Sequence, residues 1–205
     1  MLLLGWDALL SRIEVVMDIS RLASDSELEL DLSFNGASKN LLDQLSDQSA
    51  RIALTESQFW EKNLIAWIQF FRCDVSLTCP ELVRRSSSLS MGLQFTDDST
   101  IKALNSCWRA RKEKTDVLSF PMLDEDIVFP KDQSLEIGDI VVSVNTAESQ
   151  AKEENHSLAN ELLWLVSHGL MHLLGWDHPN SDRLEEMLKY QEQLLCLNGN
   201  LLKQQ

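Results

Sequence analysis

The spacing of hydrophobic residues along the chain predicts four strands. Residues 27–34, ELELDLSF, alternate acidic and apolar side chains with a period of two, which is typical of a half-buried strand. Further strands are predicted at 88–96, at 115–121, where Pro121 ends the strand, and from about residue 138. Because a short loop separates the last two strands, we expect them to pair as a hairpin.

Apolar residues at helical spacing predict five helices, at 55–71, 97–111, 146–153, 158–174 and 181–197. Thr55 and Gln58 form a candidate capping box for the first helix, and Asp98 and Ser99 are candidate N-caps of the second. In the last helix, one face is expected to carry Leu184, Met187, Leu188, Leu194 and Leu195. Since strands and helices are interspersed without a regular βαβ rhythm, we expect an α+β fold.

A chain of 205 residues suits one domain with an appendage. We expect residues 1–26 to be an N-terminal extension, 27–198 the main domain with a polar insertion or loop at 35–54, and 199–205 a tail. The apolar start is interrupted by Asp7 and lacks the basic start and cleavage site of a signal peptide. No apolar run reaches the roughly 18 residues that span a bilayer, so we expect a cytoplasmic protein with no membrane partner.

The net charge of −14 disfavours a large non-specific surface for nucleic acid, so any such contact must be local. The segment WRARKEK (108–114) concentrates positive charge at Arg109, Arg111, Lys112 and Lys114. It could bind phosphate, or it could be a solvated helix end whose dipole favours cations. The four cysteines form no CxxC pair and no regular framework, which indicates reduced thiols.

Three of the four histidines lie within the eleven residues HGLMHLLGWDH (168–178). His168 and His172 are one helical turn apart and share a face. Gly175 can adopt a positive φ that ends the helix, so that His178 can return to this face. Three imidazoles with a fourth position open are typical of a catalytic zinc site, whereas structural sites fill all four. The alternatives are core histidines without a metal and a purely structural metal.

The pattern HxxxHxxGxxH is shared with metalloproteases, in which a glutamate after the first histidine activates the water. This chain has Gly169 at that position, which makes a protease or other amide hydrolase the weaker hypothesis. A phosphodiester fits better, because three neutral imidazoles leave the full +2 charge of the metal to attract phosphate.

The same stretch resembles the signature HGxLHLxGYDH of the YbeY family, metal-dependent endoribonucleases involved in rRNA maturation. Residues 104–121, LNSCWRARKEKTDVLSFP, resemble the family block LNxxYRxxxxxTDVLSFP. Residues 138–151, GDIVVSVNTAESQA, resemble the block GDIxIsxxxAxxQA. The resemblance covers about residues 88–195, and it implies a small mixed sheet with helices packed on it and the metal in a cleft.

The resemblance also implies roles for individual residues. His168, His172 and His178 would bind one metal ion, zinc by the usual assignment, with Ni²⁺ or another divalent metal as the alternative. Arg109 would contact RNA phosphate, and Arg109 and His172 are the expected catalytic residues. The implied activity is cleavage of single-stranded RNA in 16S rRNA 3′-end maturation and ribosome quality control, with pre-16S rRNA and the small ribosomal subunit and its proteins as partners.

The chain departs from the family motifs at a few positions. Trp108 and Trp176 replace tyrosines, and Met171 replaces a leucine. We expect both tryptophans to pack in the core rather than to stack on a base. Asp177 is expected to orient a ligand or to shape the turn. A ribosome-assembly binding protein with a mainly structural metal remains the alternative function, which the acidic net charge favours.

Overall fold

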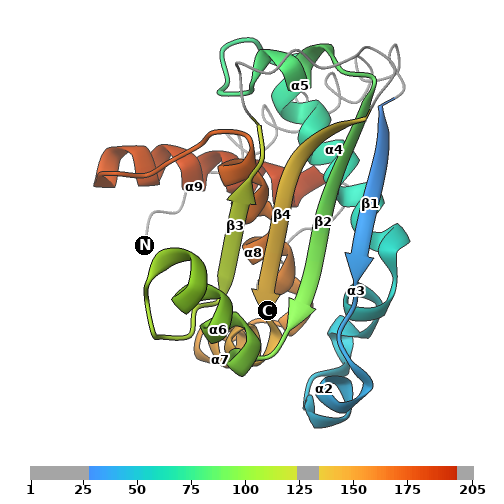
Figure 1. Cartoon of the computed structure of the whole chain (residues 1–205), viewed down its shortest axis with the longest axis vertical. Helices are drawn as coiled ribbons and strands as arrows, with labels where there is room; N and C mark the ends of the chain where they lie inside the picture. Colours follow the sequence, from blue (N-terminus) through green and yellow to red (C-terminus); the bar gives the residue numbers. More distant parts are fainter. Residues whose placement is uncertain (1–27, 124–133, 198–205) are drawn as a thin grey trace, which may run out of the picture.

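The computed structural model describes residues 28–123 and 134–197 (Figure 1). The predicted extension at 1–26 and the tail at 199–205 lie outside the described residues. Among the helices that are described, none has the length and apolar character needed to cross a membrane.

A four-stranded mixed sheet organises the fold. Its strands lie in the order β1 (Glu29–Asn35), β2 (Ser88–Thr96), β4 (Leu135–Ser143) and β3 (Val117–Pro121). The pairs β1–β2 and β2–β4 are parallel, whereas β3 runs antiparallel to β4. The α+β class, the four strands and the pairing of the last two are therefore confirmed.

A β-bulge in β4 controls which side chains face outward. Met91 of β2 pairs with Gly138, where an unbroken register would pair it with Ile137. The extra residue keeps Ile137 and Ile140 both buried, and the exposed Asp139 lies on the other face. Gly138 has a φ of +124°, a conformation that favours glycine.

Five long helices account for the predicted helical segments: α4 (Ser57–Cys73), α6 (Asp98–Arg109), α7 (Val144–Glu153), α8 (Leu158–Leu173) and α9 (Ser181–Cys196). The helices α4 and α8 pack on one face of the sheet, which we call the inner face (Figure 1). Helix α6 packs against β3 and β4 on the opposite, outer face (Figure 1).

The expectation of an insertion or loop at 35–54 is wrong. This segment contains α2 (Lys39–Gln44), a short 3₁₀ turn (Gln48–Ala50) and α3 (Arg51–Thr55), and α5 (Glu81–Arg85) is a further short helix that the pattern did not indicate. Leu41, Ala53 and Leu54 are buried in the main core. These three apolar residues among many polar ones are enough to tie the short helices to the domain.

The predicted capping box at Thr55 is also wrong. Thr55 is the last residue of α3, and its hydroxyl donates a hydrogen bond to the carbonyl oxygen of Arg51 at 2.8 Å. Helix α4 begins at Ser57 without a side-chain cap. The threonine hydroxyl therefore serves the preceding helix, which a local motif cannot reveal.

The N-cap of α6 is Asp97, one position before the two candidates, and its carboxylate accepts a hydrogen bond from the Thr100 amide at 2.7 Å. The carboxylate of Asp98 joins three other segments, because it accepts hydrogen bonds at 2.6 Å from the side chains of Ser143, Thr146 and Lys114. This network fixes the loop that follows α6 to the start of α7.

The main core lies between the inner face of the sheet and the helices α4, α8 and α9, and its largest fully buried side chains include Trp60, Trp67 and Phe71. A smaller cluster of Ile101, Leu118 and Val141 joins α6 to the outer face. In α9, Met187, Leu194 and Leu195 are buried as expected, but Leu184 is exposed, so its prediction is wrong.

Candidate metal centre

The end of α8 brings the three clustered histidines together. Gly175 has a φ of +86°, and its amide donates to the carbonyl oxygen of His172 at 3.1 Å. The amide of Trp176 reaches the carbonyl oxygen of Met171 at 3.0 Å, which completes a glycine-terminated helix end. The chain then reverses and returns His178 to the face of α8, as the sequence predicts.

The three rings converge on one point. Nitrogen atoms of His168, His172 and His178 all lie within 4.8 Å of one another. The ring centroid of His178 is 5.5 Å from that of His168 and 5.2 Å from that of His172. All three side chains are half-buried, so the group is shielded and still open to solvent.

Hydrogen bonds fix the orientation of two of the rings. Nδ1 of His168 lies 3.2 Å from Oε1 of Gln191, whose amide nitrogen donates to the Trp164 carbonyl at 2.7 Å. Nδ1 of His172 lies 2.9 Å from the Trp176 carbonyl oxygen. Because both partners are acceptors, each Nδ1 is a donor, and in the neutral rings each Nε2 carries a lone pair.

These two lone pairs face each other. Nε2 of His168 lies 3.1 Å from Nε2 of His172. Two acceptors at this distance repel each other unless a cation lies between them. Tetrahedral zinc with Zn–N bonds of about 2.0–2.1 Å holds its nitrogen ligands about 3.3 Å apart, so the geometry fits a shared metal ion.

The surroundings of these rings also favour the neutral form that binds metals. Burial lowers the pKa of His168, and the neighbouring His172 lowers it further. Burial lowers the pKa of His172 as well, although the hydrogen bond to Trp176 acts in the opposite direction. Imidazole must lose its second proton to bind a metal, so these shifts make both rings better ligands near neutral pH.

Gly169 lies where α8 touches the inner face of the sheet. A Cβ atom at this position would lie 2.9 Å from Cγ2 of Ile140 and 3.1 Å from Oγ of Ser119. Real side chains essentially never approach this closely. The protease glutamate is therefore absent, and the packing of the helix leaves no room for it.

Arg109 approaches the histidines across the edge of the sheet. It is the last residue of α6, is exposed, and its guanidinium donates to the Ser119 carbonyl of β3 at 3.4 Å. After burial, charges including that of Arg109 contribute to lowering the pKa of His172. The structure thus brings Arg109 and the histidines to neighbouring positions, as the resemblance implied.

The rest of the basic cluster is divided between structure and surface. Lys114 forms a salt bridge with Asp98 at 2.6 Å, so its charge is committed to the network that holds the loop. Arg111 and Lys112 are exposed just beyond α6. The free positive charge of this cluster is therefore concentrated next to Arg109.

The two tryptophans have different environments. Trp176 is 4% exposed, and its Nε1 donates to the Thr78 carbonyl at 2.8 Å, so core packing is confirmed for it. Trp108 is 69% exposed, and its ring contacts Phe120 edge-on at 6.0 Å between centroids. The expectation of core packing is wrong for Trp108.

Sequence reasoning missed the partners of the histidine rings. Gln191 is fully buried on α9, four residues after the buried Met187, so a polar residue on an apolar helix face was the available signal. The Ser119 carbonyl that holds Arg109 has no such signal. Asp177 shapes the turn, as expected, because its carboxylate accepts a hydrogen bond from the His178 amide at 2.8 Å.

Comparison with known proteins agrees with the motifs. The family model described as Endoribonuclease YbeY matches residues 54–198, which include all three histidines and Arg109. The chain belongs to the YbeY family. Proteins named Endoribonuclease YbeY from two strains of Prochlorococcus marinus are similar over 178 residues: that of strain MIT 9313 is 55% identical, over 87% of this chain and 95% of the relative, and that of the second strain is 48% identical, over 86% and 91%. The YbeY protein of Synechococcus sp. strain CC9311 is 48% identical over 174 residues, 85% of this chain and 98% of the relative.

Proposed function

We propose that this protein is a zinc-dependent endoribonuclease that cleaves single-stranded rRNA precursors. The observation that carries the proposal is the convergence of His168, His172 and His178, with two facing Nε2 lone pairs, in a chain of the YbeY family. The endoribonuclease names of its relatives support the reaction class. We assign the catalytic domain to residues 27–198.

The three histidines are the proposed metal ligands. An all-nitrogen set of this kind suits Zn²⁺ and also accepts Ni²⁺ and other divalent transition metals. When bound, the metal supplies a Lewis-acid charge that attracts a phosphate and favours nucleophilic attack on it. Gln191 and the Trp176 carbonyl hold the rings of His168 and His172 in the ligating orientation.

Arg109 is the proposed partner of the RNA phosphate. Its guanidinium is exposed, and the hydrogen bond to the Ser119 carbonyl holds it on the side of β3 near the histidines. A guanidinium that is already positioned can stabilise the negative charge that develops on the phosphate during cleavage. Arg111 and Lys112 add the local attraction that a chain of net charge −14 needs to hold RNA.

We also propose that the protein works in the cytoplasm on pre-16S rRNA, in 3′-end maturation and ribosome quality control. The family membership supports this role. The acidic net charge favours docking to basic proteins of the small ribosomal subunit, which would bring the enzyme to RNA that its general field repels.

The net charge also favours a second candidate function, a ribosome-assembly binding protein in which the metal is structural. An amide hydrolase is disfavoured, because the packing at Gly169 excludes the glutamate that such a site requires.

An RNA-cleavage assay with the zinc-loaded full chain separates these functions. We expect cleavage of single-stranded RNA but not of matched DNA, loss of cleavage with EDTA, recovery with added zinc, and loss in His172→Ala. Cleavage that persists when all three histidines are replaced would contradict the proposal. Background cleavage by the wild type, together with a large drop in melting temperature on metal removal, would favour the assembly function.

A further inference from the structure

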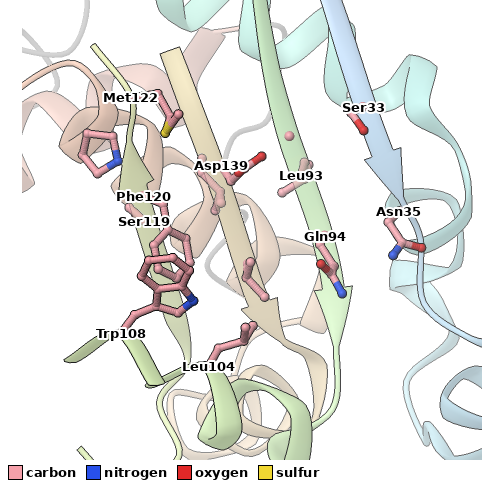
Figure 2. Close-up of a pocket in the computed structure, with 14 residues that line it drawn as sticks. Ser33, Asn35, Leu93, Gln94, Leu104, Trp108, Ser119, Phe120, Met122 and Asp139 are labelled. Carbon is pink, nitrogen blue, oxygen red and sulfur yellow. The ribbon is translucent and has the colours of Figure 1, made fainter. Parts of the chain in front are cut away.

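The outer face of the sheet carries a cavity beside α6. It has a volume of about 690 Å³ and is lined by residues of all four strands and of α6 (Figure 2). This size lies within the range of about 300–1,000 Å³ typical of sites for small ligands. The three histidines are not among the described residues that line it, so it is distinct from the metal centre.

One wall of the cavity is aromatic. Trp108 and Phe120 meet there edge-on, and Met122 extends the same wall along β3 (Figure 2). Trp108 is 69% exposed and Met122 is 57% exposed. An indole open to solvent at the edge of a cavity offers a flat surface of the kind on which nucleic-acid bases stack.

The floor of the cavity is polar. Ser33, Asn35 and Gln94 line it from β1 and β2, and Asp139 lines it from β4 (Figure 2). The Asp139 carboxylate occupies the space above Gly92, where a Cβ would lie 2.0 Å from its Oδ1. The bulge in β4 and the missing side chain at Gly92 together place an acceptor on the outer face.

The charge of this cavity selects bases over phosphates. Among the described residues that line it, none is lysine or arginine, and Asp139 contributes a carboxylate. A carboxylate repels phosphate and accepts hydrogen bonds from the amino groups of adenine, cytosine and guanine. Uracil has no amino group, and its carbonyl oxygens flank its one ring N–H.

The cavity and the metal centre meet at the end of α6. Trp108 lines the cavity, and the next residue, Arg109, donates to the carbonyl of Ser119, which precedes Phe120 on β3. Neighbouring residues of a helix point about 100° apart, so the indole and the guanidinium face different sides of the sheet edge. A nucleotide can therefore place its phosphate at Arg109 and its base against Trp108.

We propose that this cavity binds a base of the single-stranded RNA substrate, stacked on Trp108 and paired through an amino group with Asp139. The inference rests on the proposed function and adds how that site selects its substrate. It makes Trp108 a substrate-binding residue and Asp139 a determinant of base preference.

The first test compares Trp108→Ala and Trp108→Tyr with the zinc-loaded wild type. Fluorescence anisotropy gives the Kd for a labelled single-stranded RNA, and initial rates give kcat and KM. We expect Trp108→Ala to raise Kd and KM about tenfold, as for one lost stacked base, with kcat within about twofold. Trp108→Tyr should restore most of the affinity. Ile52→Ala, at another exposed apolar residue, 55% exposed on α3, is the matched control and should change neither constant.

The second test addresses Asp139. Labelled oligoadenylate, oligocytidylate and oligouridylate are compared for binding to the wild type and to Asp139→Asn. We expect the wild type to bind the first two more tightly than oligouridylate, and the amide variant to lose most of this difference. Melting temperatures of the variants verify that the fold is retained.

The outcomes separate this inference from the proposed function. If the wild type cleaves RNA while Trp108→Ala keeps its Kd and KM, the cavity does not bind a base and the endoribonuclease assignment stands. If the wild type does not cleave but Trp108→Ala weakens binding, the reverse holds. Absence of RNA binding by the wild type overturns both, and an unchanged base preference in Asp139→Asn overturns the role of Asp139.

Discussion

Nε2 of His168 lies 3.1 Å from Nε2 of His172, and each ring uses its Nδ1 to donate to a protein oxygen. The protein therefore holds two lone pairs against each other at a distance that a shared cation would stabilise. The partners of the two rings come from different places, a glutamine of α9 and a backbone carbonyl at the end of α8.

Gln191 should matter for metal affinity although it is not a ligand. Gln191→Met removes the acceptor that orients His168 and keeps the volume similar, so we expect zinc affinity to fall about 10–100-fold. Competition with a chromogenic zinc chelator measures this change. Gln193→Met on the same helix is the control and should bind zinc like the wild type; equal affinities for both variants would show that Gln191 does not orient the ligand.

Gly169→Ala tests the contact between α8 and the sheet. Overpacking against Ile140 costs about 1–3 kcal/mol, and the better helix propensity of alanine offsets about 1 kcal/mol. We therefore expect the free energy of unfolding to fall by about 1 kcal/mol in urea titrations. A variant more stable than the wild type would show that the helix tolerates a side chain at this position.

Arg109→Ala should reduce activity far more than stability. The side chain is exposed and makes one long hydrogen bond, so the melting temperature should change little. Loss of one preorganised charge contact to the phosphate should lower kcat/KM about 100-fold. Arg111→Ala, beyond the end of α6, is the control and should lose much less. A large loss of stability with normal specific activity would contradict the proposed role.

The apo protein should lose stability as the pH falls. Burial lowers the folded-state pKa of His168 and His172 below the usual 6.5. Below about pH 6.5 the unfolded chain therefore binds more protons, and the free energy of unfolding decreases. Glu161 acts in the opposite direction, because burial raises its pKa and its contribution is lost as the pH rises.

A double variant, His168→Gln with His172→Gln, isolates the contribution of the histidines to this pH dependence. Denaturant unfolding in chelator, repeated from about pH 8 to about pH 5.5, gives the slope for each protein. The wild type should lose more stability over this range than the double variant. Equal slopes would show that these rings titrate as they do in the unfolded chain.

The sequence predicted the parts of the site that depend on local geometry. The spacing of His168 and His172 places two rings on one helix face, and Gly175 has the positive φ that returns His178. The position of Gln191 depends on how α9 packs against α8, which no local pattern encodes. The three histidines could therefore be identified in advance, whereas the hydrogen bond that orients His168 could not.

Elsewhere, local signals failed where a residue had two possible partners. The Thr55 hydroxyl serves α3 rather than α4, and Asp97 rather than Asp98 caps α6. Trp108 and Trp176 occupy equivalent tyrosine positions of the family motifs, yet one is exposed on the outer face and the other is buried. The residue type alone cannot distinguish these environments, because tertiary packing decides them.

Elemental analysis of the purified full chain tests the central claim most directly. The wild type, prepared without added chelator, should carry about one zinc or other divalent transition-metal ion per chain, and the His168→Ala and His172→Ala variants should carry almost none. Glu192→Ala, on α9 beside Gln191, should retain the metal. A folded wild type that binds no transition metal even after incubation with zinc would contradict the account.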